Sequence, residues 1–179
     1  MERRKFVQGA GMAGILAAGV APAVHAQQTI RWRMASSFPK SLDTLFGTAE
    51  TFARIVTAAS GGRLTVTAHP AGELVPAFGV LDAVQQGTVE CCNTASYYFV
   101  GKDPVFGIDC AIPFGMNTRQ MTAWFFHGNG LTLMREFYRQ YNVVNFALGN
   151  TTAQMGGWYR KEINSVDDLK GLKFRTGTF

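Results

Sequence analysis

Three short stretches of alternating polar and apolar residues constrain the fold of this chain more than any other feature. They span residues 29–35, 63–69 and 88–94, and a longer stretch of helical character follows each of the first two. Side chains of a strand point alternately to the two faces of a sheet, so this period of two predicts strands. The order strand, helix, strand, helix, strand predicts an α/β fold with parallel strands and crossover helices.

The two stretches between these strands have the spacing of amphipathic helices. Residues 43–59 place Leu45, Ala49 and Phe52 three or four positions apart, and two adjacent glycines follow. A second helix is expected over residues 77–86, with a glycine directly after it.

The second half of the chain predicts further elements with the same two periodicities. A short helix is expected after Ser165, whose hydroxyl is a typical N-cap. Further helices are expected at 118–127 and about 131–141, and further strands at 143–148, 153–159 and 172–175.

Residues 1–26 have the three parts of a secretory signal. The charged start contains Arg3 and Arg4, an apolar run spans residues 9–24, and small residues at 24 and 26 precede a predicted cleavage before Gln27. The arginine pair resembles a twin-arginine (Tat) signal, and an ordinary Sec signal is the alternative. The apolar run is shorter than the roughly 20 residues of a membrane span, and no later run reaches that length, so no membrane insertion of the mature chain is expected.

Charge and cysteine content exclude several classes of function. Without the three basic and one acidic residues of the signal, 14 basic and 11 acidic residues remain, a net charge of +3 too small and scattered for nucleic-acid binding. Adjacent strand residues face opposite ways, so Cys91 and Cys92 are not expected to bridge, and with Cys110 they are expected to be small buried thiols. No spacing of histidine and cysteine suits zinc, and no arrangement predicts catalysis, so neither an enzyme nor a cofactor is expected.

A ligand is expected at the carboxyl ends of the three strands. Ligands of open parallel sheets bind there, and the loops in question are residues 36–38, 71–73 and 96–98. If the third strand continues through Tyr97 and Tyr98, these two side chains point to opposite sides. One would then line the pocket and the other would lie in the core.

Several motifs together carry a resemblance to a known family. The most specific are Gln-Met-Gly-Gly-Trp at 154–158 and Asp-Leu-Lys-Gly-Leu-Lys-Phe-Arg at 168–175. The others are Phe-Pro-Lys-Ser-Leu-Asp at 38–43, Ala-Gly-Glu-Leu-Val-Pro at 71–76, Tyr-Tyr at 97–98, Gly-Lys-Asp-Pro at 101–104 and Pro-Phe-Gly at 113–115. With these motifs, residues 29–179 closely resemble the periplasmic solute-binding proteins of TRAP transporters, in the branch that captures 2-oxo and 2-hydroxy monocarboxylates.

The resemblance implies roles for particular residues. Arg175 would grip the carboxylate of the ligand, and Gln154 would help to hold a sodium ion and the ligand. Asn150 and Tyr98 are pocket neighbours by their position, and Phe38 is a candidate apolar wall. The alternatives are an ordinary surface arginine, a glutamine that faces water, a turn asparagine, and a tyrosine and a phenylalanine that pack in the core.

The resemblance also implies an α/β, periplasmic-binding-protein-like clamshell of two domains, truncated here. Residues 1–26 would be the signal, 27–150 an incomplete first domain and 151–179 the beginning of the second. The expected function is to capture a small carboxylate such as pyruvate in the periplasm, with Na⁺ as a possible co-ligand, and to deliver it to the TRAP membrane permease subunits. An exported sensor or enzyme on the same scaffold, and an inactive gene fragment, remain as alternatives.

Overall fold

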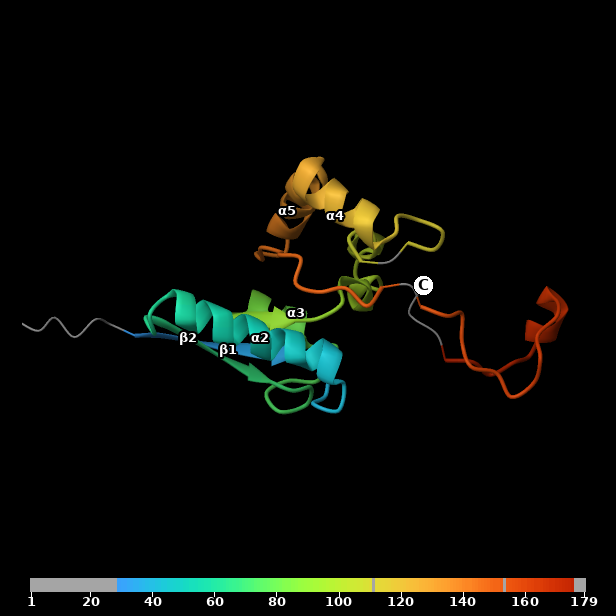
Figure 1. The fold of residues 1–179 in the computed structure, drawn as a ribbon, viewed down its shortest axis with the longest axis horizontal. Helices are drawn as coiled ribbons and strands as arrows, with labels where there is room; N and C mark the ends of the chain where they lie inside the picture. The colour runs from blue at the N-terminus through green and yellow to red at the C-terminus, as the bar shows by residue number, and fades with distance from the viewer. Residues whose placement is uncertain (1–28, 111, 153, 176–179) are drawn as a thin grey trace, which may run out of the picture.

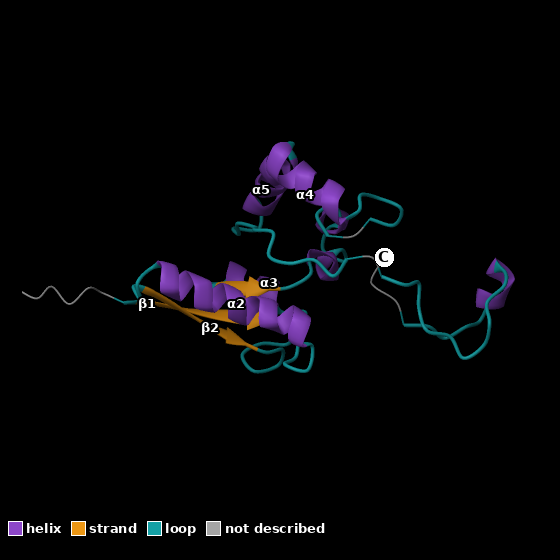
Figure 2. Cartoon of the chain, in the orientation of Figure 1, coloured by secondary structure: helices purple, strands orange, loops and turns teal. Residues whose placement is uncertain are grey.

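A computed structural model of the protein describes residues 29–110, 112–152 and 154–175. Three parallel strands, orange in Figure 2, form a sheet in the order β2-β1-β3. They are β1 (Ile30–Ser36), β2 (Leu64–His69) and β3 (Cys91–Asn93). The predicted parallel sheet is therefore confirmed, although β3 is shorter than the alternating stretch that predicts it. The predicted signal at 1–26 lies outside the described residues.

Helices cover both faces of this sheet. Helix α2 (Asp43–Ala59) lies along the sheet in Figure 1, and α3 (Val80–Gln85) precedes β3. Met34 packs with residues of α2, whereas the next residue of β1, Ala35, packs with residues of α3. Neighbouring side chains of β1 thus point to opposite faces of the sheet, as the period of two predicts. The bounds of α2 are those predicted, and α3 begins three residues later than predicted.

A second group of helices lies beside the sheet, joined to it by two 3-10 turns. The turns are η1 (Ser96–Phe99) and η2 (Pro104–Gly107), and the helices are α4 (Thr118–His127) and α5 (Gly130–Arg139), shown in yellow and orange in Figure 1. Phe106 is fully buried, and aromatic residues of η1 and α5 surround it. Helix α4 spans the predicted residues, and the side chains of Asn117 and Gln120 cap its start.

Three of the predicted strands are absent from the described structure. Residues 143–148, 154–159 and 172–175 are irregular. A strand needs a hydrogen-bonded neighbour, and among the described residues none of these segments pairs with a strand of the sheet. The continuation of the third strand is also wrong, because the chain turns into η1 at Ser96.

Residues 154–175 form an arm that extends from the body of the fold (Figure 1). The rings of Tyr159 and Phe174 stack, with centroids 4.9 Å apart and planes 10° from parallel. The predicted helix after Ser165 is the 3-10 turn η3 (Val166–Leu169). The Asp168 carboxylate caps it by accepting from the backbone N–H and the hydroxyl of Ser165, at 2.8 and 3.0 Å.

The three cysteines are free thiols, as predicted. Burial raises the pKa of Cys91 to about 11 and that of Cys92 to about 12. Cys110, predicted to be buried, is exposed, because it lies in the irregular stretch after η2 rather than in the sheet. Among the described residues, no helix has the length and apolar character that a membrane span requires.

An ion pair joins the central strand to the start of β3. The Arg33 guanidinium donates to both carboxylate oxygens of Glu90, at 2.8 and 3.1 Å, and to the carbonyl of Thr88 at 2.7 Å. The backbone N–H of Arg33 donates to the same carboxylate at 2.7 Å. These bonds, first those of the Arg33 side chain, lower the pKa of Glu90 from 4.5 to about 2. The pair thus adds a side-chain link between the central strand and the residue that precedes β3.

Replacing Glu90 by glutamine is expected to lower thermal stability at neutral pH by a few degrees, because the pair is exposed and therefore weak. The folded state has the lower pKa, so the pair contributes fully above about pH 4.5 and loses its contribution as the pH falls toward about 2. Thermal unfolding followed by circular dichroism over this range checks the prediction. Glu50→Gln, at an exposed glutamate of α2, is the control. Equal loss of stability in wild type and Glu90→Gln on acidification would contradict it.

Candidate ligand-binding site

The loops at the carboxyl edge of the sheet are tied together by hydrogen bonds. Ser37 Oγ donates to the carbonyl of Ala77 at 2.6 Å and lies 2.7 Å from Thr94 Oγ1. Because Ser37 has one hydroxyl proton, Thr94 is the donor of the second bond. The N–H of Ala71 donates to the carbonyl of Phe38 at 3.1 Å. The loops after all three strands therefore meet at one edge, as the sequence predicts.

An aromatic cluster covers this edge, with Tyr98 at its centre. The Tyr98 ring lies 6.2 Å from Phe38, 5.2 Å from Phe78 and 4.7 Å from Tyr97, centroid to centroid, in tilted or edge-on geometries that aromatic rings favour. Phe38 is buried, whereas Phe78 is 64% exposed. The structure thus joins Phe38 and Tyr98, two of the predicted site residues, in one apolar wall.

Arg175 acts on this wall through its charge. Burial and the neighbouring Tyr98 raise the pKa of Tyr97 to about 12, and the positive charge of Arg175 opposes this rise. This influence is the smallest of those acting on Tyr97, and the Arg175 guanidinium is exposed.

The side chains of Asn150 and Gln154 are held by neighbouring hydroxyl and backbone groups. Asn150 Oδ1 accepts from Thr118 Oγ1 at 2.8 Å and from the N–H of Thr152 at 2.6 Å, which is the geometry of a turn asparagine. Gln154 Nε2 donates to Thr151 Oγ1 at 2.8 Å. Asn150 therefore has its amide N–H groups to offer a ligand, and Gln154 its amide oxygen.

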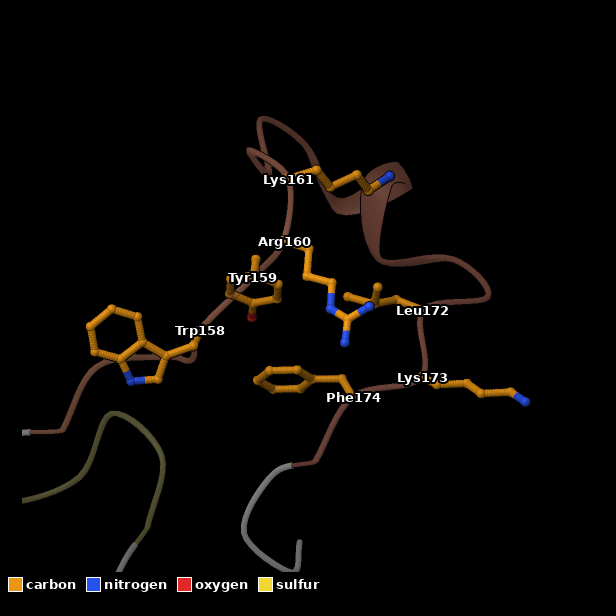
Figure 3. A pocket seen from close by; sticks show the side chains of 7 residues that line it. All are labelled: Trp158, Tyr159, Arg160, Lys161, Leu172, Lys173 and Phe174. Atoms are coloured by element: carbon orange, nitrogen blue, oxygen red, sulfur yellow. The ribbon is translucent and has the colours of Figure 1, made fainter.

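A separate cavity of about 370 Å³ lies within the arm. Figure 3 shows aromatic rings and basic side chains around it. Its lining residues are Trp158, Tyr159, Arg160, Lys161, Leu172, Lys173 and Phe174. None of the predicted site residues lines it. Its walls are the two lengths of the arm that the Tyr159–Phe174 stack holds side by side.

A cation at the candidate site would need neutral oxygen donors. In the described parts of the chain, no three histidine, cysteine, aspartate or glutamate residues are grouped as metal ligands are. The amide oxygen of Gln154 is a hard donor that fits Na⁺ or Ca²⁺ rather than a transition metal. One such oxygen supplies only part of a coordination shell.

Tyr97 and Phe78 are two residues of this edge that the sequence analysis does not select. The period of two assigns only one of the two tyrosines to the pocket, but the turn η1 brings both rings into the cluster. Phe78 lies two residues after the end of the Ala-Gly-Glu-Leu-Val-Pro motif, and this position is the signal that identifies it.

Residues 35–178 match the bacterial extracellular solute-binding proteins, family 7. The chain belongs to this family. The family consists of binding proteins, so the prediction that the chain is not an enzyme is confirmed.

Several relatives resemble this chain closely. It is 53% identical over 146 residues to the monocarboxylate 2-oxoacid-binding periplasmic protein of Nostoc sp. (strain PCC 7120), covering 82% of this chain and 40% of that protein. A TRAP transporter solute-binding protein of Bordetella bronchiseptica RB50, with calcium and picolinate in one active site, is 47% identical with a TM-score of 0.82, covering 84% of this chain and 45% of that one. A TRAP periplasmic solute-binding protein of Pseudoalteromonas atlantica, with sodium and pyruvate, is 41% identical with a TM-score of 0.78. The match covers 81% of this chain and 44% of that one.

These likenesses confirm the fold predicted for the chain. Its described part has the periplasmic-binding-protein-like α/β architecture of TRAP solute-binding proteins. The chain spans less than half the length of these relatives.

Replacing Ser37 by alanine is expected to lower the free energy of unfolding by about 1–2 kcal/mol, because the Ala77 carbonyl and the Thr94 hydroxyl both lose their partner in a largely buried position. Urea unfolding followed by fluorescence checks this. The control is Ser41→Ala, at an exposed serine of the same loop. Equal midpoints for the two variants would show that Ser37 does not hold the loops together.

Proposed function

We propose that the chain belongs to the extracytoplasmic solute-binding subunit of a TRAP transporter and binds a 2-oxo acid such as pyruvate together with a cation. The observation that carries the proposal is the aromatic wall of Phe38 and Tyr98 at the carboxyl edge of the sheet, in a chain 53% identical to a monocarboxylate 2-oxoacid-binding periplasmic protein. An apolar wall with one cationic group suits a small organic acid.

Arg175 is the proposed anchor of the carboxylate. Its planar guanidinium can hold both carboxylate oxygens by charge-assisted hydrogen bonds. Tyr98 and Phe38 form the apolar side of the pocket, and the amide N–H groups of Asn150 face the polar end of the acid. Exclusion of water by the aromatic rings strengthens the ion pair, since a low local dielectric increases the attraction between charges.

Gln154 is the proposed protein donor to the cation. The Nε2 bond to Thr151 fixes the orientation of the amide, so that its oxygen remains for a metal ion. The Pseudoalteromonas relative holds sodium with pyruvate, and the Bordetella relative holds calcium with picolinate. We propose Na⁺ here because the amide oxygen is a neutral, hard donor and the Pseudoalteromonas relative holds sodium with pyruvate.

The proposal extends to the domains, the partner and the compartment. Residues 27–150 would form the first lobe of the clamshell and residues 151–179 the beginning of the second, so Arg175 would come from the second lobe. Closure of the lobes would bury the acid, and the permease subunits of the transporter would then receive it. The twin-arginine signal at 1–26 would send the folded protein to the periplasm.

Replacing Arg175 by glutamine is expected to weaken pyruvate binding at least tenfold, because a charge-assisted hydrogen bond contributes about 1.5–3 kcal/mol. Isothermal titration calorimetry of the full chain with pyruvate checks this. Arg160→Gln is the matched control, at an exposed arginine of the same arm. Unchanged affinity in Arg175→Gln would remove Arg175 as the anchor.

The same titrations in sodium, calcium and choline buffers test the cation. Binding is expected to require a metal cation, and Gln154→Ala is expected to need a higher sodium concentration for half-maximal affinity. Equal affinity in choline would contradict a metal co-ligand.

Replacing Arg3 and Arg4 by lysines is expected to stop export, because the Tat machinery recognises the arginine pair. Immunoblots of cytoplasmic and periplasmic fractions check this through the ratio of precursor to mature protein. Lys5→Arg is the control that keeps the pair and the charge. Normal processing of the double variant would indicate the Sec route.

A further inference from the structure

The carboxylate of Asp109 accepts hydrogen bonds from three different segments of the chain. Asp109 Oδ1 accepts from Ser96 Oγ at 2.5 Å, and Asp109 Oδ2 accepts from the Tyr138 hydroxyl at 2.9 Å and from Asn145 Nδ2 at 3.4 Å. Asp109 itself lies in the irregular stretch after η2, so these side-chain bonds and not a regular element fix its surroundings.

Two of the three segments lead directly into the candidate site. Ser96 begins η1 and directly precedes Tyr97 and Tyr98. Asn145 lies in the irregular segment 143–150, which leads to Asn150 and then to Gln154. The third segment is α5, which carries Tyr138 in the buried core. Asp109 thus joins both ligand-facing segments to a rigid part of the fold.

The segment that contains Asn145 has few other attachments within the described structure. The N–H of Val143 donates to the Tyr138 carbonyl at 3.3 Å, and the guanidinium of Arg135 lies 5.2 Å from the centre of the Phe146 ring. A segment without helix or strand bonds depends on such side-chain contacts for its position. The bond between Asn145 and Asp109 therefore holds the start of this segment, and the bond from Thr118 Oγ1 to Asn150 Oδ1 holds its end, next to Gln154.

This arrangement costs stability. Burial raises the pKa of Asp109, against the effect of its three hydrogen bonds, which shows that desolvation of the carboxylate is unfavourable. Within the described residues, Asn145 Oδ1 is buried without a hydrogen-bond partner. Apolar residues in a buried position are often as stable as such a network, or more stable. The buried Asp109 carboxylate and the unpaired Asn145 oxygen both lower stability. Their role in holding particular segments in place accounts for their presence.

We propose that Asp109 is a positioning residue of the ligand site, which holds the tyrosine pair through Ser96 and the Asn150–Gln154 segment through Asn145, without contacting the ligand itself. The inference rests on the proposed function in so far as these two segments bind the acid and the cation. It adds a residue and a mechanism to that site.

The test replaces Asp109 by asparagine, which keeps the size of the side chain but removes its charge and one acceptor oxygen. The variant is expected to bind pyruvate about tenfold more weakly in calorimetry. With 3-fluorotyrosine incorporated, the ¹⁹F resonances of Tyr97 and Tyr98 are expected to shift while that of Tyr159 on the arm stays in place. Single Tyr→Phe variants assign these three among the five tyrosine resonances.

Two further variants keep the test decisive if Asp109→Asn folds poorly. Ser96→Ala removes only the link to η1 and is expected to shift the same two resonances without unfolding the chain. Asp103→Asn, an N-cap of η2 where asparagine caps equally well, is the matched control and is expected to change neither the affinity nor the resonances of Tyr97, Tyr98 and Tyr159. Asp109→Ala removes both acceptor oxygens and so breaks the same link as Ser96→Ala, and adding Ser96→Ala to it is expected to cause no further shift of the two tyrosine resonances.

The outcomes separate this inference from the proposed function. Additive effects of Ser96→Ala and Asp109→Ala on the tyrosine resonances, or unchanged resonances and affinity in Asp109→Asn, would overturn the positioning role while leaving the binding function intact. A wild-type chain that does not bind pyruvate would overturn the proposed function. The ¹⁹F shifts would still decide whether Asp109 positions the tyrosine pair.

Discussion

The opposite orientation of Met34 and Ala35 on the central strand is the constraint on which the rest of the structure depends. One side chain packs against α2 and the other against the group that contains α3, so β1 is fixed between two apolar layers. A shift of one residue would exchange the two faces and bury polar groups. Because β1 cannot shift, the residues that follow it have fixed positions, and Ser37 and Phe38 reach the other two loops.

The sequence predicts the elements that depend on local patterns and fails where a distant partner is needed. Helices α2 and α4 have the predicted bounds because spacing, caps and glycines lie within the helices or beside them. The alternating stretch at 143–148 is irregular, since alternation favours a strand only if a neighbour supplies hydrogen bonds. The turn at Tyr97–Tyr98 is missed for a related reason: no local signal marks where β3 leaves the sheet.

The residues of the candidate site also fall into two groups, those that a local motif identifies and those that only the tertiary structure brings together. The motifs select Arg175 and Gln154, and the structure brings Phe38 and Tyr98 together in one aromatic cluster. Asp109 has no comparable signal, because a single aspartate in an irregular stretch resembles any solvated acid. Its importance emerges only when the fold brings together Ser96, Tyr138 and Asn145, which come from three separate segments. Such contacts follow from tertiary structure and not from spacing.

The burial of the thiols in β3 has a consequence for the chemistry of the chain after export. Thiolates are the reactive form of cysteine, and at neutral pH a pKa of about 12 leaves on the order of one Cys92 side chain in 100,000 ionised. Oxidants and disulfide-exchange enzymes would therefore react slowly with Cys92, and the pKa of about 11 protects Cys91 in the same way. The sheet thus slows oxidation and disulfide exchange at these two adjacent thiols.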